Sequence, residues 1–236
     1  MATFVLVHGT SAGGWIWKHI AQRLREVGHD PYTLSLTGCG DRVHLATRDV
    51  GLDTHITDTA NLIEYEDLTD VVLVGHSYGG MVISGVAERM PTRIGHLVYH
   101  DAIVPHSGES LIDHMTPDRR RDTEEQVRTA GAGWLIPLSQ GPNDLPSPRR
   151  TRHPWKTWAD PVQVGNPAAL TIPRTYIRCT ADKGPGMPFA GILDVSYERA
   201  KAGGWRIREL DTVHQIRPNP GIVAEALVDL FPVAHG

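Results

Sequence analysis

Ser77 lies in the pentapeptide Gly75-His76-Ser77-Tyr78-Gly79, a G-x-S-x-G pattern between an apolar run and a helical pattern. Such a turn is sharp, and its small residues allow a strand and a helix to approach each other closely. The turn presents the serine hydroxyl above the edge of a sheet. It also leaves the amide of Tyr78 at a helix N-terminus, where a developing oxyanion is stabilised. The pattern therefore predicts a nucleophilic serine that performs acyl transfer, rather than a serine in an ordinary glycine turn.

A second amide donor for the oxyanion is expected in the loop His8-Gly9-Thr10, directly after the first apolar run of the chain. The loop at this place commonly supplies that donor, and a glycine allows the backbone to approach the substrate closely. We assign the second amide to Thr10, with Ser11 as the alternative. Gly9 and Ser11 are expected to line the substrate pocket.

A serine nucleophile requires a base, and His214 fits that role. The expected order along the chain is serine, acid, histidine. His214 follows the last predicted strand and precedes the final predicted helix. The later His235 lies beside the C-terminus, where chains are commonly poorly ordered. We therefore predict that His214 takes the proton from Ser77.

The acid that orients the base has two candidates. Asp182 follows a late strand, where the chain order places the acid, and it is our preferred assignment. Asp101 ends an earlier strand and points to the same sheet edge, so it either takes this role or lines the substrate pocket. Asp211 is closer to His214 in sequence, but a carboxylate so near is more typical of a turn.

Alternating strands and helices are predicted to position these residues. Short apolar runs indicate strands at 4–7, 31–36, 71–74, 96–100, 175–179 and 205–210. Helical spacing indicates helices at 15–27, 54–66, 81–89, 189–202 and 219–231. This alternation predicts an α/β fold with a doubly wound, mostly parallel sheet and helices on both faces.

Residues 106–173 interrupt the alternation. They contain many prolines and arginines, no convincing buried strand, and the tryptophans Trp155 and Trp158. An excursion of this length is either functional or disordered, and its aromatic residues favour a functional cap. We therefore predict a core formed by 1–105 and 174–236, with a small inserted cap at 106–173. Trp155 and Trp158 are expected to form an apolar part of the substrate pocket.

Composition excludes several classes of function. The chain has 236 residues, 40% of them hydrophobic, and a net charge of −4, so no positive field favours nucleic acid or an anionic membrane. The two cysteines and the short N-terminal apolar run indicate a reduced, cytoplasmic protein without a signal peptide or membrane span. The histidines are scattered, so no zinc site is expected. The sequence leaves the oligomeric state, including a homodimer, open.

Taken together, the motifs resemble those of the plant methylesterase and hydroxynitrile lyase family of α/β-hydrolases. The resemblance covers most of the chain outside the cap. It is carried by Val5-Leu6-Val7-His8-Gly9, Gly13-Gly14-Trp15, Gly28-His29, the segment from Val74 to Met81, and Cys179-Thr180-Ala181-Asp182-Lys183-Gly184. The resemblance implies an α/β-hydrolase fold with a small cap, no cofactor, and a triad of Ser77, His214 and Asp182.

The sequence departs from the lyases of that family at two positions. The lyases have a threonine directly after the first-strand histidine and a lysine directly after the catalytic histidine, where this chain has Gly9 and Gln215. Because that lysine stabilises the departing cyanide, its absence favours hydrolysis of a small-molecule ester, such as a methyl, aryl or secondary-metabolite ester. Lyase chemistry and a non-catalytic binding protein are the alternatives. Epoxide hydrolases and dehalogenases would need a carboxylate at position 77.

Overall fold

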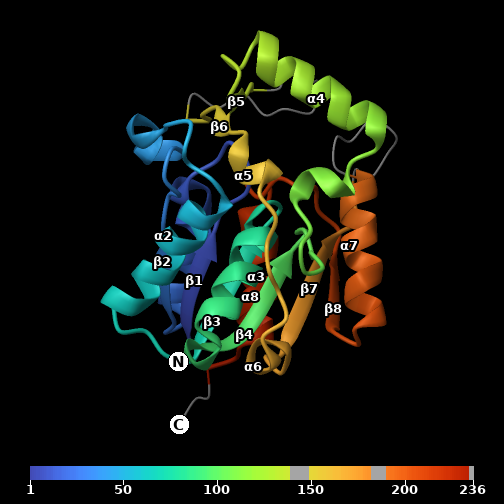
Figure 1. Ribbon diagram of the computed structural model, residues 1–236. Helices are drawn as coiled ribbons and strands as arrows, with labels where there is room; N and C mark the ends of the chain where they lie inside the picture. The colour runs from blue at the N-terminus through green and yellow to red at the C-terminus, as the bar shows by residue number, and fades with distance from the viewer. Residues whose placement is uncertain (139–148, 182–189, 234–236) are drawn as a thin grey trace.

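A wholly parallel, six-stranded sheet forms the centre of the computed structural model, which describes residues 1–138, 149–181 and 190–233 (Figure 1). The spatial order of the strands is β2-β1-β3-β4-β7-β8. The strands are β1 (Thr3–Val7), β2 (Asp30–Thr33), β3 (Val71–His76), β4 (Ile94–His100), β7 (Arg174–Cys179) and β8 (Arg206–Leu210). The order reverses between β1 and β3, and such a reversal opens a crevice at the carboxyl ends of the strands. The predicted doubly wound α/β fold is confirmed.

Helices cover both faces of the sheet because its central strands are apolar on both sides. Phe4 and Leu6 of β1 pack toward α1 (Lys18–Glu26) and α8 (Pro220–Leu230). Val5 and Val7 of the same strand belong to the core that includes α2 (Leu52–Tyr65), α3 (Gly79–Arg89) and α7 (Ala190–Ala202). Alternate residues of a strand point to opposite faces, so this single apolar run builds two hydrophobic cores.

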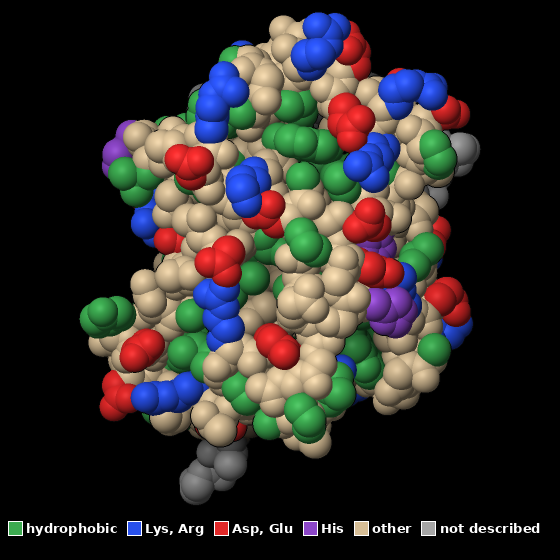
Figure 2. Space-filling model, in the orientation of Figure 1, with side chains coloured by type: hydrophobic (Ala, Val, Ile, Leu, Met, Phe, Trp, Pro, Cys, Tyr) green, Lys and Arg blue, Asp and Glu red, His purple; other side chains and the backbone are tan. Residues whose placement is uncertain are grey.

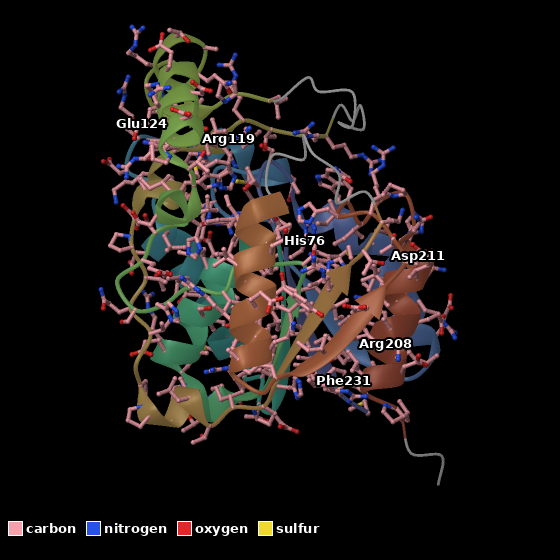
Figure 3. All side chains as sticks on the ribbon, turned by 90° about the vertical axis from the view of Figure 1, so that its right-hand side faces the viewer. His76, Arg119, Glu124, Arg208, Asp211 and Phe231 are labelled. Atoms are coloured by element: carbon pink, nitrogen blue, oxygen red, sulfur yellow. The ribbon has the colours of Figure 1, made fainter. Side chains whose placement is uncertain are left out.

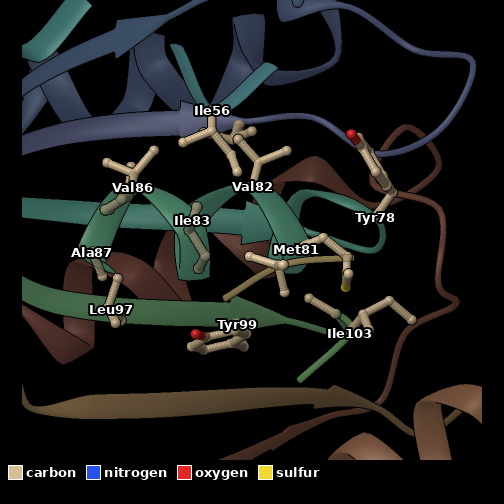
Figure 4. Close-up of a cluster of buried hydrophobic side chains, with 14 of the residues drawn as sticks. Ile56, Tyr78, Met81, Val82, Ile83, Val86, Ala87, Leu97, Tyr99 and Ile103 are labelled. Carbon is tan, nitrogen blue, oxygen red and sulfur yellow. The ribbon is translucent and has the colours of Figure 1, made fainter. Parts of the chain in front are cut away.

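Helix α3, which follows Ser77, lies in the centre of the larger core (Figure 4). Nearly all of its side chains are buried, and they pack against α2 and β4. The cluster includes Ile56, Met81, Val82, Ile83, Val86, Ala87, Leu97 and Tyr99. Close packing on several sides fixes the position of α3 and of the turn at its N-terminus.

The segment between β4 and β7 contributes no strand to the main sheet in its described part. It contains α4 (Pro117–Thr129), the strand pair β5 (Leu135–Ile136) and β6 (His153–Pro154), α5 (Lys156–Ala159) and α6 (Pro167–Leu170). Figure 1 shows α4 and the β5–β6 pair at the top of the molecule, above the sheet. The division of the chain into a core and a cap stays a prediction.

Helix α4 has a solvated, charged surface. Only Thr123 and Val127 of this helix are buried. The side chains of Arg119 and Glu124 project outward from the ribbon (Figure 3), and Arg120 pairs with Glu124 at 2.9 Å. Basic and acidic side chains are interspersed over the face shown in Figure 2. These observations agree with the absence of a strong field of one sign on this face.

Strand β2 ends three residues earlier than the sequence indicates, at Thr33 rather than Leu36. The reason is that, beyond Thr33, hydrogen bonds with side chains take the place of backbone hydrogen bonds between strands. The Leu36 amide donates to Nε2 of His8 at 3.0 Å, and the Ser35 hydroxyl accepts from the Gly14 amide at 2.8 Å. Among the described residues, no helix has the length and apolar character that crossing a membrane requires.

Candidate active site

The turn at Ser77 has the strained geometry that the sequence indicates. Strand β3 ends at His76 and α3 begins at Gly79, and Ser77 between them has a φ of 55°. A Cβ atom at position 75 would lie 2.6 Å from the carbonyl oxygen of Gly79, and one at position 79 would lie 2.9 Å from that of Val7. Only glycine permits this approach of strand, turn and helix. Backbone strain of this kind is characteristic of functional sites.

Three side chains from distant parts of the chain form a line of hydrogen bonds. The Ser77 hydroxyl donates to Nε2 of His214 at 3.1 Å, and Nδ1–H of His214 donates to Oδ2 of Asp101 at 2.7 Å. Asp101 is fully buried, and Ser77 and His214 are each 8% exposed. This arrangement can transfer a proton from the serine to the imidazole while the carboxylate holds the ring.

The carboxylate beside His214 is therefore Asp101, the alternative candidate of the sequence analysis. Its Oδ1 accepts from the Cys179 amide at 3.3 Å, and its own amide donates to the Ile177 carbonyl at 2.7 Å. These bonds fix Asp101 between β4 and β7. Our preferred candidate, Asp182, lies outside the described residues, so the preference for it over Asp101 has no support in the structure.

The register of the sheet explains why Asp101 reaches the site. His76 and His100 are partners in neighbouring strands β3 and β4, and Ser77 and Asp101 directly follow them. Both residues have positive φ, 55° and 43°. The carboxylate and the nucleophile therefore leave adjacent strands at the same level of the sheet edge.

His76 supports the loop that carries the base. Its Nε2–H donates to the backbone carbonyl of His214 at 2.9 Å, and the two rings lie 4.7 Å apart at an interplanar angle of 34°. Burial holds the pKa of His76 well below its usual value. His76 is thus neutral, and it positions His214 without placing a positive charge beside it.

The loop after β1 lies directly against the nucleophile. A Cβ atom on Gly9 would be 2.8 Å from Cβ of Ser77. His8 fixes the loop, since its Nδ1–H donates to the Gly9 carbonyl at 2.7 Å. In the described part of the chain, no acceptor contacts the amide N–H of Thr10 or of Tyr78. The role of these two amides as oxyanion donors stays a prediction.

The predicted pocket residues are arranged around this loop. Trp158 is 3% exposed, and its indole N–H donates to the Thr10 hydroxyl at 3.1 Å. Trp155 is half-buried and packs against Trp158, with ring centroids 6.3 Å apart. Ser11 is buried, with a φ of 59°. Their role in binding a substrate stays a prediction.

The structure also shows a group of buried histidines that the sequence analysis did not single out. His55 contacts the Tyr78 hydroxyl through Nδ1 at 2.9 Å, and His153 accepts from the Ser11 amide at 3.4 Å. These contacts join residues far apart in sequence, so no local pattern reveals them. Among the described residues, no group of three His, Cys, Asp or Glu side chains is placed to hold a metal ion.

Comparison with known proteins identifies the family. The model of the alpha/beta hydrolase family matches residues 4–221. The chain belongs to the alpha/beta hydrolase family. Among solved structures, an extracellular alpha/beta-hydrolase from a Paenibacillus species, described as sharing structural and functional homology with tobacco salicylic acid binding protein 2, matches with a TM-score of 0.81. It has 26% sequence identity, over 97% of this chain and 98% of that one.

Curated relatives of this alpha/beta hydrolase are esterases by name. A carbendazim hydrolyzing esterase of Nocardioides sp. (strain SG-4G) is 54% identical over 112 residues, 48% of this chain and 46% of that protein. The putative chloroplastic methylesterase 14 of Arabidopsis thaliana is 35% identical over 111 residues, 47% of this chain and 32% of that protein. Each of these two matches spans less than half of the relative's length. The predicted resemblance to plant methylesterases is confirmed.

The close contact at Gly9 gives a testable prediction for this alpha/beta hydrolase. In Gly9→Ala the new methyl group would meet Ser77 Cβ at 2.8 Å, so the loop or the nucleophile must move. A displacement near 1 Å can lower a rate about 100-fold. We expect kcat to fall by roughly 10- to 100-fold, measured with any ester that the wild-type protein cleaves. Gly221→Ala, where the new Cβ meets nothing within 4 Å, is the matched control and should retain its rate. An unchanged rate in Gly9→Ala would contradict the contact.

Burial of neutral histidines predicts a loss of stability in acid. Burial lowers the pKa of both His8 and His55 to about 4. Between about pH 4 and the usual value near 6.5, the unfolded chain binds more protons than the folded one, so the free energy of unfolding rises with pH. Acidification across this window should cost roughly 3 kcal/mol per histidine. Urea unfolding at several pH values measures the free energy of unfolding. A free energy that stays constant between pH 4.5 and 7 would contradict the prediction.

Proposed function

We propose that this alpha/beta hydrolase cleaves the carboxylic ester of a small molecule through an acyl-enzyme on Ser77. The observation that carries the proposal is the line of hydrogen bonds from Ser77 through His214 to Asp101, at 3.1 and 2.7 Å. Similarity to proteins named esterases and methylesterases supports the same reaction class. The proposal assigns the catalytic acid to Asp101.

The first half of the reaction forms the acyl-enzyme. Oγ of Ser77 attacks the ester carbonyl carbon while its proton passes to Nε2 of His214. Asp101 holds the imidazole through Nδ1 and stabilises its charged form. The amides of Thr10 and Tyr78 donate to the oxyanion of the tetrahedral intermediate, where one such donor contributes about 3–4 kcal/mol in a studied protease. The bond to the alcohol oxygen then breaks, and His214 returns the proton to that oxygen.

The second half of the reaction releases the acid. A water molecule attacks the acyl carbon, and His214 takes its proton and delivers it to the departing Ser77 oxygen. The same two amides stabilise the second oxyanion. Neutral His76, bound to the backbone of His214, keeps the base in place in both halves of the cycle.

Two features favour hydrolysis over lyase chemistry. Gln215 follows the base, so the cation that would stabilise a departing cyanide is absent from that position. Gly9 also stands where the lyases have a threonine. Even a Cβ atom at this position would lie 2.8 Å from Cβ of Ser77. A threonine at this position would require the nucleophile or the loop to move.

A panel of substrates tests the proposed function. The purified protein is incubated with methyl esters, aryl esters, lactones and carbendazim, and the acid and alcohol products are quantified by chromatography. We expect turnover of at least one ester and loss of that turnover in Ser77→Ala. Cleavage of a cyanohydrin in place of esters would support the lyase alternative, and saturable binding without turnover would support a binding protein.

A further inference from the structure

The segment between β4 and β7 contacts, through its residues 151–158, the loop that bears the proposed oxyanion donor Thr10. The Trp158 indole N–H donates to the Thr10 hydroxyl at 3.1 Å. The contact joins residues 148 positions apart, and Trp158 is almost completely buried. The hydroxyl that receives this bond belongs to the same residue whose amide we assign to the oxyanion, so the side-chain bond restrains that amide.

The backbone on the far side of Thr10 is held by the same segment. The Ser11 amide donates to Nδ1 of His153 at 3.4 Å, and the Thr151 amide donates to the Ser11 carbonyl at 3.2 Å. Ser11 has a φ of 59°, a conformation that non-glycine residues keep only when their surroundings impose it. Bonds on both sides of the Ser11 peptide supply that restraint.

The second proposed donor, Tyr78, also contacts this segment. The rings of Tyr78 and His153 lie 5.0 Å apart in an edge-to-face arrangement, and the Tyr78 hydroxyl contacts His55 at 2.9 Å. His153 is fully buried, and burial holds its pKa well below the usual value, so it is neutral and can accept the Ser11 N–H. One segment therefore touches the residues on both sides of the expected oxyanion.

We propose that segment 151–158 positions the oxyanion loop, with Trp158 as a positioning residue that acts through the Thr10 hydroxyl. The inference rests on the proposed function, since it assigns Thr10 to the oxyanion. It differs from the expectation that Trp158 only lines the substrate pocket. A pocket residue affects KM, whereas a residue that positions an oxyanion donor affects kcat, because the donor binds most strongly in the transition state.

The two roles are separated by variants of the hydrogen-bonded pair. Trp158→Phe removes the indole N–H and keeps an aromatic ring, Thr10→Val removes the acceptor, and Thr10→Ser retains it. Because complete removal of an oxyanion donor lowers kcat by about 10²–10³-fold, a displaced donor should cost on the order of 10-fold. We expect that loss in Trp158→Phe and Thr10→Val, with a KM within about twofold, and a smaller loss of kcat in Thr10→Ser than in Thr10→Val.

The double variant Trp158→Phe/Thr10→Val tests whether the two residues act as one unit. We expect it to lose no more than either single variant, whereas independent roles would give the product of the two losses. Trp205→Phe, a half-buried tryptophan that packs on Tyr99 away from the site, is the matched control and should keep its kcat. Melting temperatures identify any variant that has lost its fold.

Amide hydrogen exchange of residues 9–12 provides a readout that does not depend on turnover. If Trp158 holds the loop, exchange in the peptide covering Thr10 becomes faster in Trp158→Phe and stays unchanged in Trp205→Phe. Unchanged exchange, multiplicative losses in the double variant, or an effect on KM alone would overturn the positioning role. If the wild-type protein cleaves no ester while Trp158→Phe still loosens the loop, the proposed function fails and the positioning of the loop stands.

Discussion

Ser77→Ala should lower kcat for ester hydrolysis by about 10³- to 10⁶-fold while the protein stays folded. The substitution removes the oxygen that His214 contacts at 3.1 Å, and no other part of the line of hydrogen bonds can form the acyl-enzyme. The loss is measured under saturating substrate, together with a melting curve. The small, almost buried side chain predicts little change in stability.

Ser84→Ala is the matched control for this experiment. Ser84 is a buried serine of α3, and its hydroxyl contacts the Gly80 carbonyl at 2.7 Å and the Tyr99 hydroxyl at 2.8 Å, away from His214. This variant should lose about 1 kcal/mol of stability through the broken hydrogen bonds and keep its kcat. Turnover retained in Ser77→Ala, or an equal loss in both variants, would remove Ser77 from the mechanism.

Asp101→Asn should cause the second large loss, a fall in kcat of about 10⁴-fold. An asparagine of the same shape can present its amide to Nδ1 of His214, which turns the imidazole to the tautomer that cannot accept the Ser77 proton. The 2.7 Å contact and the full burial of Asp101 make this the strongest single effect expected outside the nucleophile and the base.

Two other aspartates serve as comparisons. Asp182→Asn, at the position that we preferred from the sequence, should cost much less than Asp101→Asn. Asp211→Asn changes an exposed carboxylate near His214 in sequence (Figure 3) and should leave the rate unaffected. A larger loss in Asp182→Asn than in Asp101→Asn would return the acid to position 182 and would refute the assignment made from the contacts.

The fold was predictable where the sequence is apolar and regular. Residues 71–74 form a continuous apolar run that is buried on both faces, so they indicate a central strand without further information. Helix α4 was not predicted, because only Thr123 and Val127 of its residues are buried and no apolar stripe results. The strand boundary at Thr33 also depends on side-chain bonds from His8 and Ser35, which no local pattern encodes.

The candidate site was predictable only in part. Ser77 and His214 follow from a local motif and from chain order, and the structure brings them together. The choice between Asp101 and Asp182 depends on which strands are neighbours and in which register, and the pairing of His76 with His100 supplies that information. The contact between Trp158 and Thr10 spans 148 positions, so only the folded chain reveals it.

Covalent labelling tests the central claim most directly. The protein is treated with a fluorophosphonate, which reacts with activated serines, and the adduct is located by mass spectrometry of the intact protein and its peptides. The account predicts a single adduct on the peptide that contains Ser77, with labelling that parallels the loss of ester hydrolysis and is absent in Ser77→Ala. Ester hydrolysis that continues without an adduct on Ser77, or with an adduct on another residue, would contradict the account.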